Sequence, residues 1–172
     1  MVPFTEWLSQ TSLSIAIQTH LWVIPTIQSI HIVGIGVVVG SVFMMNLRVL
    51  GWAGRDQSLH ETVDRFGPWM SASLCVLLLT GALMVIGEPA RELLAFSFWF
   101  KMFLVAVGTV FASAFMMAVR RNEPHWEESL VKRRTTKWLA VLTLLIWATI
   151  IVLGRLIAYD HIWGSWSGTP RL

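Results

Sequence analysis

Residues 20–50 read HLWVIPTIQSIHIVGIGVVVGSVFMMNLRVL, a run long and apolar enough to cross a lipid bilayer. One ionisable side chain, His31, lies well inside this run, nine residues after Trp22 and therefore roughly 13 Å further along a helix. A polar group left unpaired in hydrocarbon costs several kcal/mol. A histidine at that depth therefore marks a candidate functional site.

The whole composition is that of a membrane protein. Of the 172 residues, 55% are hydrophobic and 13% are charged, whereas a soluble domain carries about 25% charged residues. The formal net charge of +3 does not indicate nucleic-acid binding, because the basic residues stand at the ends of apolar runs. Cys75 is the only cysteine, which excludes an internal disulfide and any paired-cysteine metal motif.

Four apolar runs each approach the ~20 residues that cross the hydrocarbon. Residues 4–19, which mix Trp7 with Ser, Thr and Gln, predict a short helix in the headgroup region. We therefore predict an all-α integral membrane four-helix bundle with an N-terminal interfacial helix, formed as one domain from residues 1–172. The predicted spans are 22–47, 67–87, 98–119 and 138–158.

The connections carry their own signals. Ser58 and Glu61 form a capping-box pattern that predicts a separate helix of about two turns before the second span. Residues 88–97 are a short connection, so the second and third spans are expected to be antiparallel neighbours. Residues 120–137 are expected to form an amphipathic surface helix, and the aromatic tail after residue 159 is expected to be ordered.

The distribution of basic residues predicts the orientation. One side carries nine of them, namely Arg48, Arg55 and Arg65 together with six in residues 120–137. The other side carries four, namely Arg91, Lys101, Arg155 and Arg171. Because basic loops stay in the cytoplasm, both termini are expected outside, in the periplasm if the membrane is a bacterial inner membrane.

The functional interpretation of His31 is an axial ligand to a b-type haem, because imidazole is a regular haem ligand and helix-bundle cores are usual haem sites. Gly34, three residues later, would make room for the ring. Lys101 and Arg155 lie near the outer surface, where they can pair with haem propionates or extend to the interface. Glu88 is expected to pair with Lys101 or Arg91.

The sequence leaves more than one candidate for the second haem ligand. Met84 and Met102 lie in the outer halves of the second and third spans and would give a His/Met pair with His31. His20 and His161 both lie near the outer boundary and could instead form a separate bis-histidine site.

Two other interpretations of His31 stand beside haem. Imidazole with the Met84 and Met102 thioethers is a soft ligand set that suits copper(I). Alternatively, His31 serves only structure and is hydrogen-bonded to Gln28, to Ser29 or to a neighbouring helix.

Several short motifs of this chain resemble motifs of a known group of proteins. They are W-x-x-P-x-I-x-x-I-H-x-x-G from Trp22 to Gly34, N-L-R-V-L-G from Asn46 to Gly51, Pro68-Trp69, Glu88-Pro89 and Phe100-Lys101-Met102. The pattern resembles an uncharacterised family of small bacterial four-helix integral membrane proteins. That family is distantly similar to copper-resistance D-type proteins and four-helix b-type cytochromes, so the resemblance implies a haem or copper site.

The sequence shows no nucleophile–base pair, phosphate loop or paired carboxylates, so an electron-transfer or accessory subunit is favoured over an enzyme. We expect a haem-binding membrane subunit that passes electrons between the quinone pool and a periplasmic partner. It is expected to contact membrane lipid, to form a homo-oligomer or join a larger complex, and to bind no nucleic acid. Copper handling and a cofactor-free accessory role are the alternatives.

Overall fold

The structure, a computed structural model, describes residues 2–54, 56–121 and 134–157. These residues form helices and their connections, with no strand among them. Four helices are long and apolar enough to cross a membrane, namely α3 (Val23–Leu50), α4 (Leu59–Gly87), α6 (Phe96–Arg121) and α8 (Arg134–Ile157). The predictions of an all-α fold and of four membrane helices are therefore confirmed, and the chain is a multi-pass membrane protein.

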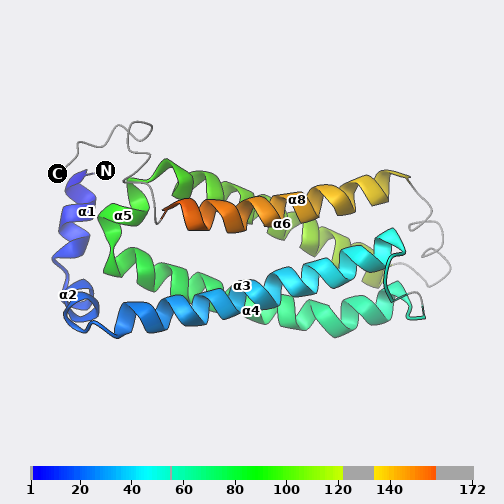
Figure 1. Cartoon of the computed structure of the whole chain (residues 1–172), viewed down its shortest axis with the longest axis horizontal. Coiled ribbons are helices and arrows are strands. Elements are labelled where there is room, and N and C mark those ends of the chain that lie inside the picture. Colours follow the sequence, from blue (N-terminus) through cyan, green and yellow to red (C-terminus); the bar gives the residue numbers. More distant parts are fainter. Residues whose placement is uncertain (1, 55, 122–133, 158–172) are drawn as a thin grey trace.

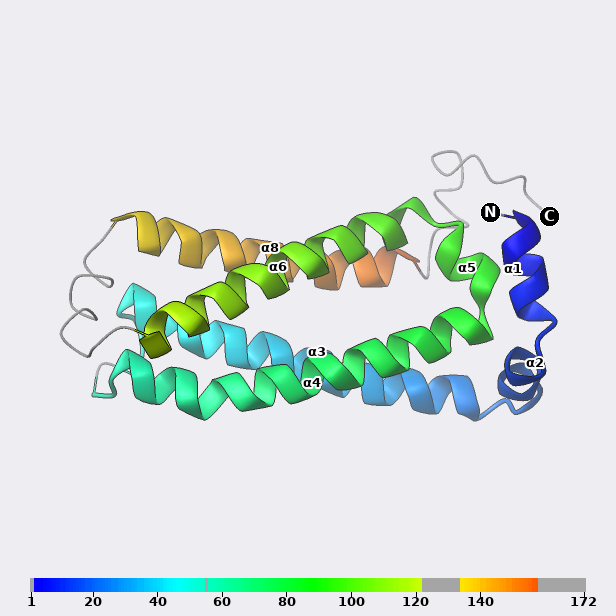
Figure 2. The same cartoon turned by 180° about the vertical axis from the view of Figure 1, so that it is seen from behind.

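The four long helices form two antiparallel pairs (Figure 1). α3 packs along α4, α6 packs along α8, and α3 also contacts α8. Helices α4 and α6 meet near the α3–α4 connection, where Gly67 faces the Met116 sulfur, and they separate toward the opposite end of the bundle (Figure 2). The second and third spans are thus antiparallel as predicted, but they touch chiefly at one end.

Three short helices lie together at the end where α3 begins (Figure 1). They are α1 (Val2–Ser9), α2 (Ser12–Thr19) and α5 (Pro89–Leu93), and we call this group the cap. Helix α1 lies across the long axis of the bundle (Figure 1). We call this end of the bundle the cap end and the opposite end the loop end.

The prediction of one interfacial helix over residues 4–19 is wrong, because the chain forms two helices there. Thr11 interrupts the run: its hydroxyl donates to the Leu8 carbonyl at 2.7 Å and accepts from the Ser14 amide at 3.4 Å. A threonine that bonds its local backbone in this way competes with helix continuation and begins a new helix as its N-cap.

The prediction of a separate short helix after Ser58 is also wrong. The capping box is present, since the Ser58 hydroxyl accepts from the Glu61 amide at 3.0 Å and the Glu61 carboxylate accepts from the Ser58 amide at 2.8 Å. The helix that it begins, however, continues unbroken to Gly87 with Pro68 inside it. A proline removes one backbone hydrogen bond, and a long helix with intact turns on both sides can continue through it.

The cap is attached to the bundle through the end of α4. The Ser14 hydroxyl donates to the Ile86 carbonyl at 2.7 Å, and the Gln18 amide donates to the Gly87 carbonyl at 2.9 Å. The last carbonyls of a helix have no partner within that helix. Two polar side chains of α2 therefore satisfy acceptors that α4 leaves open.

Buried apolar side chains form two clusters instead of one continuous core. The larger one, with Val38, Met70 and Trp147 among its members, runs through the middle and the loop end of the bundle. The smaller one lies at the cap end around Phe98 and Ile157. Many other apolar side chains of the long helices are exposed, as contact with lipid requires.

Replacing Gly34 with leucine is expected to lower the thermal unfolding midpoint of the purified protein, at a cost of about 1–3 kcal/mol for overpacking. The reason is that a Cβ on Gly34 would lie 3.0 Å from the Leu77 Cδ2 atom of α4. Gly36→Leu is the matched control, because a Cβ there meets nothing within 4 Å. Equal losses in the two variants would contradict the packing of α3 on α4.

Candidate functional site

The candidate site begins with a hydrogen bond between two membrane helices. His31 on α3 faces Thr80 on α4, with the ring Nδ1 atom 2.7 Å from the threonine Oγ1 atom. Thr80 is buried, and its hydroxyl donates its one hydrogen to the Val76 carbonyl of its own helix at 2.7 Å. While it makes that bond, the hydroxyl can only accept from His31, and the tautomer that fits this arrangement carries its proton on Nδ1. In the neutral ring, Nε2 therefore keeps its lone pair.

The same ring lies against a glycine. A Cβ on Gly81 would be 3.6 Å from the His31 Cε1 atom, so Gly81 leaves room for the edge of the imidazole that ends in Nε2. Gly81 thus faces His31 of α3, whereas Gly67, fourteen residues earlier on α4, faces the Met116 sulfur of α6.

Lys101 adds a charge at this level. It lies on α6, close enough to His31 for electrostatic interaction. Its Cδ atom is 3.9 Å from where a Cβ on Gly154 of α8 would lie, and its ammonium lies 5.4 Å from the centre of the Phe98 ring. Lysine thus buries its stem between two helices while its charge contacts an aromatic face.

Polar side chains from different helices therefore share one level of the bundle. This level lies between the two apolar clusters, toward the cap end, and contains His31, Thr80, Gly81 and Lys101. We call these four residues the His31 layer. A layer of ionisable groups that interrupts apolar packing inside a membrane bundle costs stability, which is the usual sign of a functional site.

A buried carboxylate lies beyond Lys101 at the cap end. Glu92 of α5 is 9% exposed. Burial raises the pKa of its carboxyl group above the ordinary value of 4.5, while the charges of Lys101 and Arg91 lower it and Glu88 raises it. Lys101 thus lies within electrostatic reach of both Glu92 and His31.

The other predicted ligands lie at different distances from the layer. Met84 follows Thr80 by four residues and shares its face of α4. Met102 is 37% exposed on α6, and His20 is exposed at the C-terminal cap of α2. No described contact brings either of them to His31. His161 lies outside the residues that the structure describes.

The predicted glycine and basic partners also have defined places. Gly34 is buried against Leu77, so the space at this glycine is occupied by α4. Arg155 lies in the last turn of α8, next to Gly154 and therefore near Lys101. Glu88 pairs with Arg91, the second of its two expected partners.

Two further predictions from the sequence fall outside the described residues. They are the amphipathic helix, in all but the ends of residues 120–137, and the ordered tail after residue 159. Within the described residues, no three His, Cys, Asp or Glu side chains gather in a way that could hold a metal ion.

Fold and site together define a multi-pass helical membrane protein with the His31 layer between its helices. Residues 4–160 match the profile of a family of unknown function, DUF6644, so the chain belongs to that family. Searches of curated proteins and of solved structures return no match.

Thr80→Val is expected to destabilise the purified protein by about 0.5–2 kcal/mol, the range of interhelical polar contacts in membranes. The substitution removes the acceptor of the His31 Nδ1 proton and keeps the side-chain shape. Thr149→Val is the matched control, because that exposed hydroxyl donates to the Leu145 carbonyl of its own helix. A chemical-denaturation series in detergent measures both, and equal losses would contradict the interhelical role of Thr80.

Glu92→Gln is expected to make stability less dependent on pH. The folded state holds the Glu92 proton more tightly than the unfolded chain, so this group stabilises the fold below pH 4.5 and loses that contribution as pH rises through the raised pKa. The unfolding midpoint of the variant should therefore rise relative to that of wild type as pH increases above 4.5. Glu6→Gln, at an exposed acid of α1, is the control, and a pH-independent difference for Glu92→Gln would refute this linkage.

Proposed function

We propose that this protein binds a b-type haem in its membrane bundle, with the Nε2 atom of His31 as an axial ligand, and that it serves as an electron-transfer subunit. The observation that carries the proposal is the bond from His31 Nδ1 to Thr80. Ligating histidines commonly donate their other ring N–H to a fixed acceptor, which sets the tautomer and the ring orientation. His31 has this arrangement, with Nε2 available as the ligand.

The residues present fit one side of such a group. Leu77 occupies the space beside Gly34, so a flat macrocycle would have to approach His31 along another face. Gly81, which has no side chain beside the His31 Cε1 atom, is the glycine next to the ring. Lys101 and Arg155 would supply positive charge for propionates. When bound, the haem iron supplies one-electron chemistry.

The chain's own groups would then prepare and protect the site. Thr80 holds the imidazole in the ligand-competent tautomer and limits its rotation. Buried apolar clusters flank the layer on both sides. Met84, which shares the face of Thr80 on α4, would be the candidate for a second ligand through its thioether. Among the described residues no other histidine lies at this level.

The proposed setting follows from the charge distribution. In the sequence, nine basic residues stand in or beside the connections from the first to the second span and from the third to the fourth. This favours a cytoplasmic location for that side of a bacterial inner membrane, with the cap end and both termini in the periplasm. The His31 layer would then lie nearer the periplasmic surface. This position suits transfer of electrons between the quinone pool and a periplasmic partner, by an oligomer or within a larger complex.

Copper handling is the second candidate, and the placement of Met84 favours it. Helices α3 and α4 are antiparallel, and side chains lean toward the N-terminus of their own helix. His31 therefore leans toward the cap end, while Met84, one turn beyond Thr80, leans back toward His31. Imidazole and thioether converging across a close helix pair would suit copper(I), which needs less room than a macrocycle.

His31→Ala is expected to abolish or strongly shift the Soret absorbance of the purified membrane protein, because it removes the axial ligand. His60→Ala is the matched control, since His60 is exposed at the start of α4, with its Nε2 atom 3.3 Å from the Asp64 Oδ2 atom. The control should leave the spectrum unchanged. Circular dichroism of each variant checks that the helices are retained.

Metal analysis of the same preparations separates the remaining outcomes. Copper in wild type that is lost in His31→Ala, with no Soret absorbance in either, would favour the copper site. Wild type with neither absorbance nor bound metal would refute both cofactor proposals. The protein would then be a cofactor-free accessory subunit in which His31 joins two helices.

A further inference from the structure

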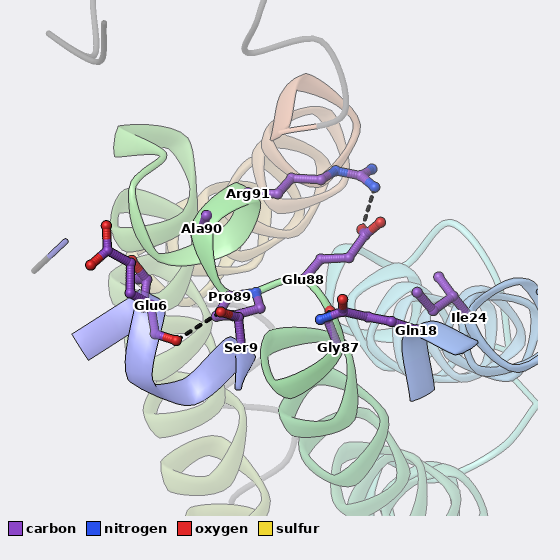
Figure 3. A pocket seen from close by; sticks show the side chains of 10 residues that line it. Glu6, Ser9, Gln18, Ile24, Gly87, Glu88, Pro89, Ala90 and Arg91 are labelled. Atoms are coloured by element: carbon purple, nitrogen blue, oxygen red, sulfur yellow. Dashed lines mark hydrogen bonds and ion pairs between the residues drawn. The ribbon is translucent and has the colours of Figure 1, made fainter. Parts of the chain in front are cut away.

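A hollow lies away from the His31 layer, within the cap. It has a volume of about 460 Å³ and is bounded by α1, α2, α5, the end of α4 and the first turn of α3. Figure 3 shows Gln18 and Ile24 on one part of its wall and Glu88 and Arg91 on another. The hollow therefore combines an amide, an apolar side chain and two opposite charges.

Gln18 contributes an acceptor to this wall. Its Nε2 atom donates to the Ser14 hydroxyl and to the Gly87 carbonyl, each at 2.9 Å. An amide nitrogen has two hydrogens, so both are used and the carbonyl oxygen is the part of Gln18 left to accept. These two bonds also fix the orientation of the amide, which makes the acceptor part of a built wall.

The charged part of the wall is an ion pair. Arg91 donates to the Glu88 carboxylate, and both side chains remain partly exposed. Glu6 also lines the hollow, but its carboxylate points away from this pair in Figure 3. The wall thus presents one negative and one positive group side by side, which complements a ligand that carries both charges close together.

The surroundings of the hollow are those of a membrane interface. Helix α1 exposes Phe4 and Trp7, and the chain next to the hollow exposes Leu21 (90%) and Trp22 (68%). Ile24 belongs to the first turn of membrane helix α3, so the hollow opens where the apolar part of the bundle begins. A ligand here can place polar groups in the cap while hydrocarbon lies along α3.

We propose that this hollow binds the phosphoethanolamine head group of a zwitterionic phospholipid. The primary ammonium donates to the Glu88 carboxylate and the Gln18 carbonyl oxygen, and Arg91 donates to the lipid phosphate. The acyl chains lie along the exposed apolar side chains at the start of α3. A choline head group has no N–H to donate, so the site discriminates between the two zwitterionic lipids. This inference concerns a different site and does not depend on the proposed function.

Native mass spectrometry of the full-length protein, purified and mixed with phosphatidylethanolamine and phosphatidylcholine of identical acyl chains, tests the site. Wild type is expected to retain the ethanolamine lipid about tenfold better, the size expected for a charge-assisted hydrogen bond. Glu88→Gln should remove that preference. Asp56→Asn, an exposed acid at the loop end, should keep it. Equal retention of both lipids by wild type, or an unchanged preference in Glu88→Gln, overturns the proposal.

Two further measurements hold even if Glu88→Gln does not fold. The thermal midpoint of wild type should be higher in vesicles with phosphatidylethanolamine than in vesicles with phosphatidylcholine alone, and no difference overturns the proposal. Soluble glycerophosphoethanolamine should fail to displace the bound lipid at equal concentration, because it has no acyl chains. Efficient displacement would show that the site takes free head groups and would overturn the assignment to a membrane lipid.

Discussion

The last carbonyls of a helix have no partner within that helix, and leaving them unpaired beside apolar surroundings costs free energy, so they need partners from elsewhere in the protein. In this chain the end of α4 obtains two of them from α2, through Ser14 and Gln18. These bonds hold α2 over the end of the bundle, where α1 packs against α5. The position of Glu88, Arg91 and the buried Glu92 therefore follows from the need to finish one helix.

The same constraint acts on side chains within the membrane. His31 has one ring nitrogen satisfied by Thr80, and Thr80 is in turn satisfied by the carbonyl of Val76. The His31 ring lies beside Gly81, which has no side chain. A histidine with only a structural role could lie within a continuous apolar core. Here the two apolar clusters end on either side of the His31 layer. This interruption adds to the His31–Thr80 bond as support for the proposed ligand site.

Much of this arrangement can be predicted from the sequence, and the exceptions have physical reasons. The four membrane helices follow from the length of the apolar runs, and His31 follows from its depth. Thr80 was missed, although a hydroxyl within the run LLLTGALMV at a similar depth on the second span was a usable signal. Glu92 was also missed, because one residue of a short polar connection carries no sign of its burial.

The two errors in the helix boundaries have a common origin. Whether Thr11 or Pro68 ends a helix depends on which hydrogen bonds the surroundings offer. Thr11 ends the first N-terminal helix through hydrogen bonds to neighbouring backbone groups. At Pro68 the long helix α4 continues, because the turns on both sides of the proline are formed. Neither outcome can be derived from residue preferences alone, since both residues are compatible with either result.

The attachment of α2 to α4 has a consequence for the order in which the protein is made. Ser14 and Gln18 precede their acceptors by 72 and 69 residues, so neither bond can form when the N-terminal segment leaves the ribosome. Helices α3 and α4 must both be inserted before the carbonyls of Ile86 and Gly87 can accept hydrogen bonds from α2. The first nineteen residues therefore dock late in biogenesis, and until then they depend on lipid and solvent for their partners.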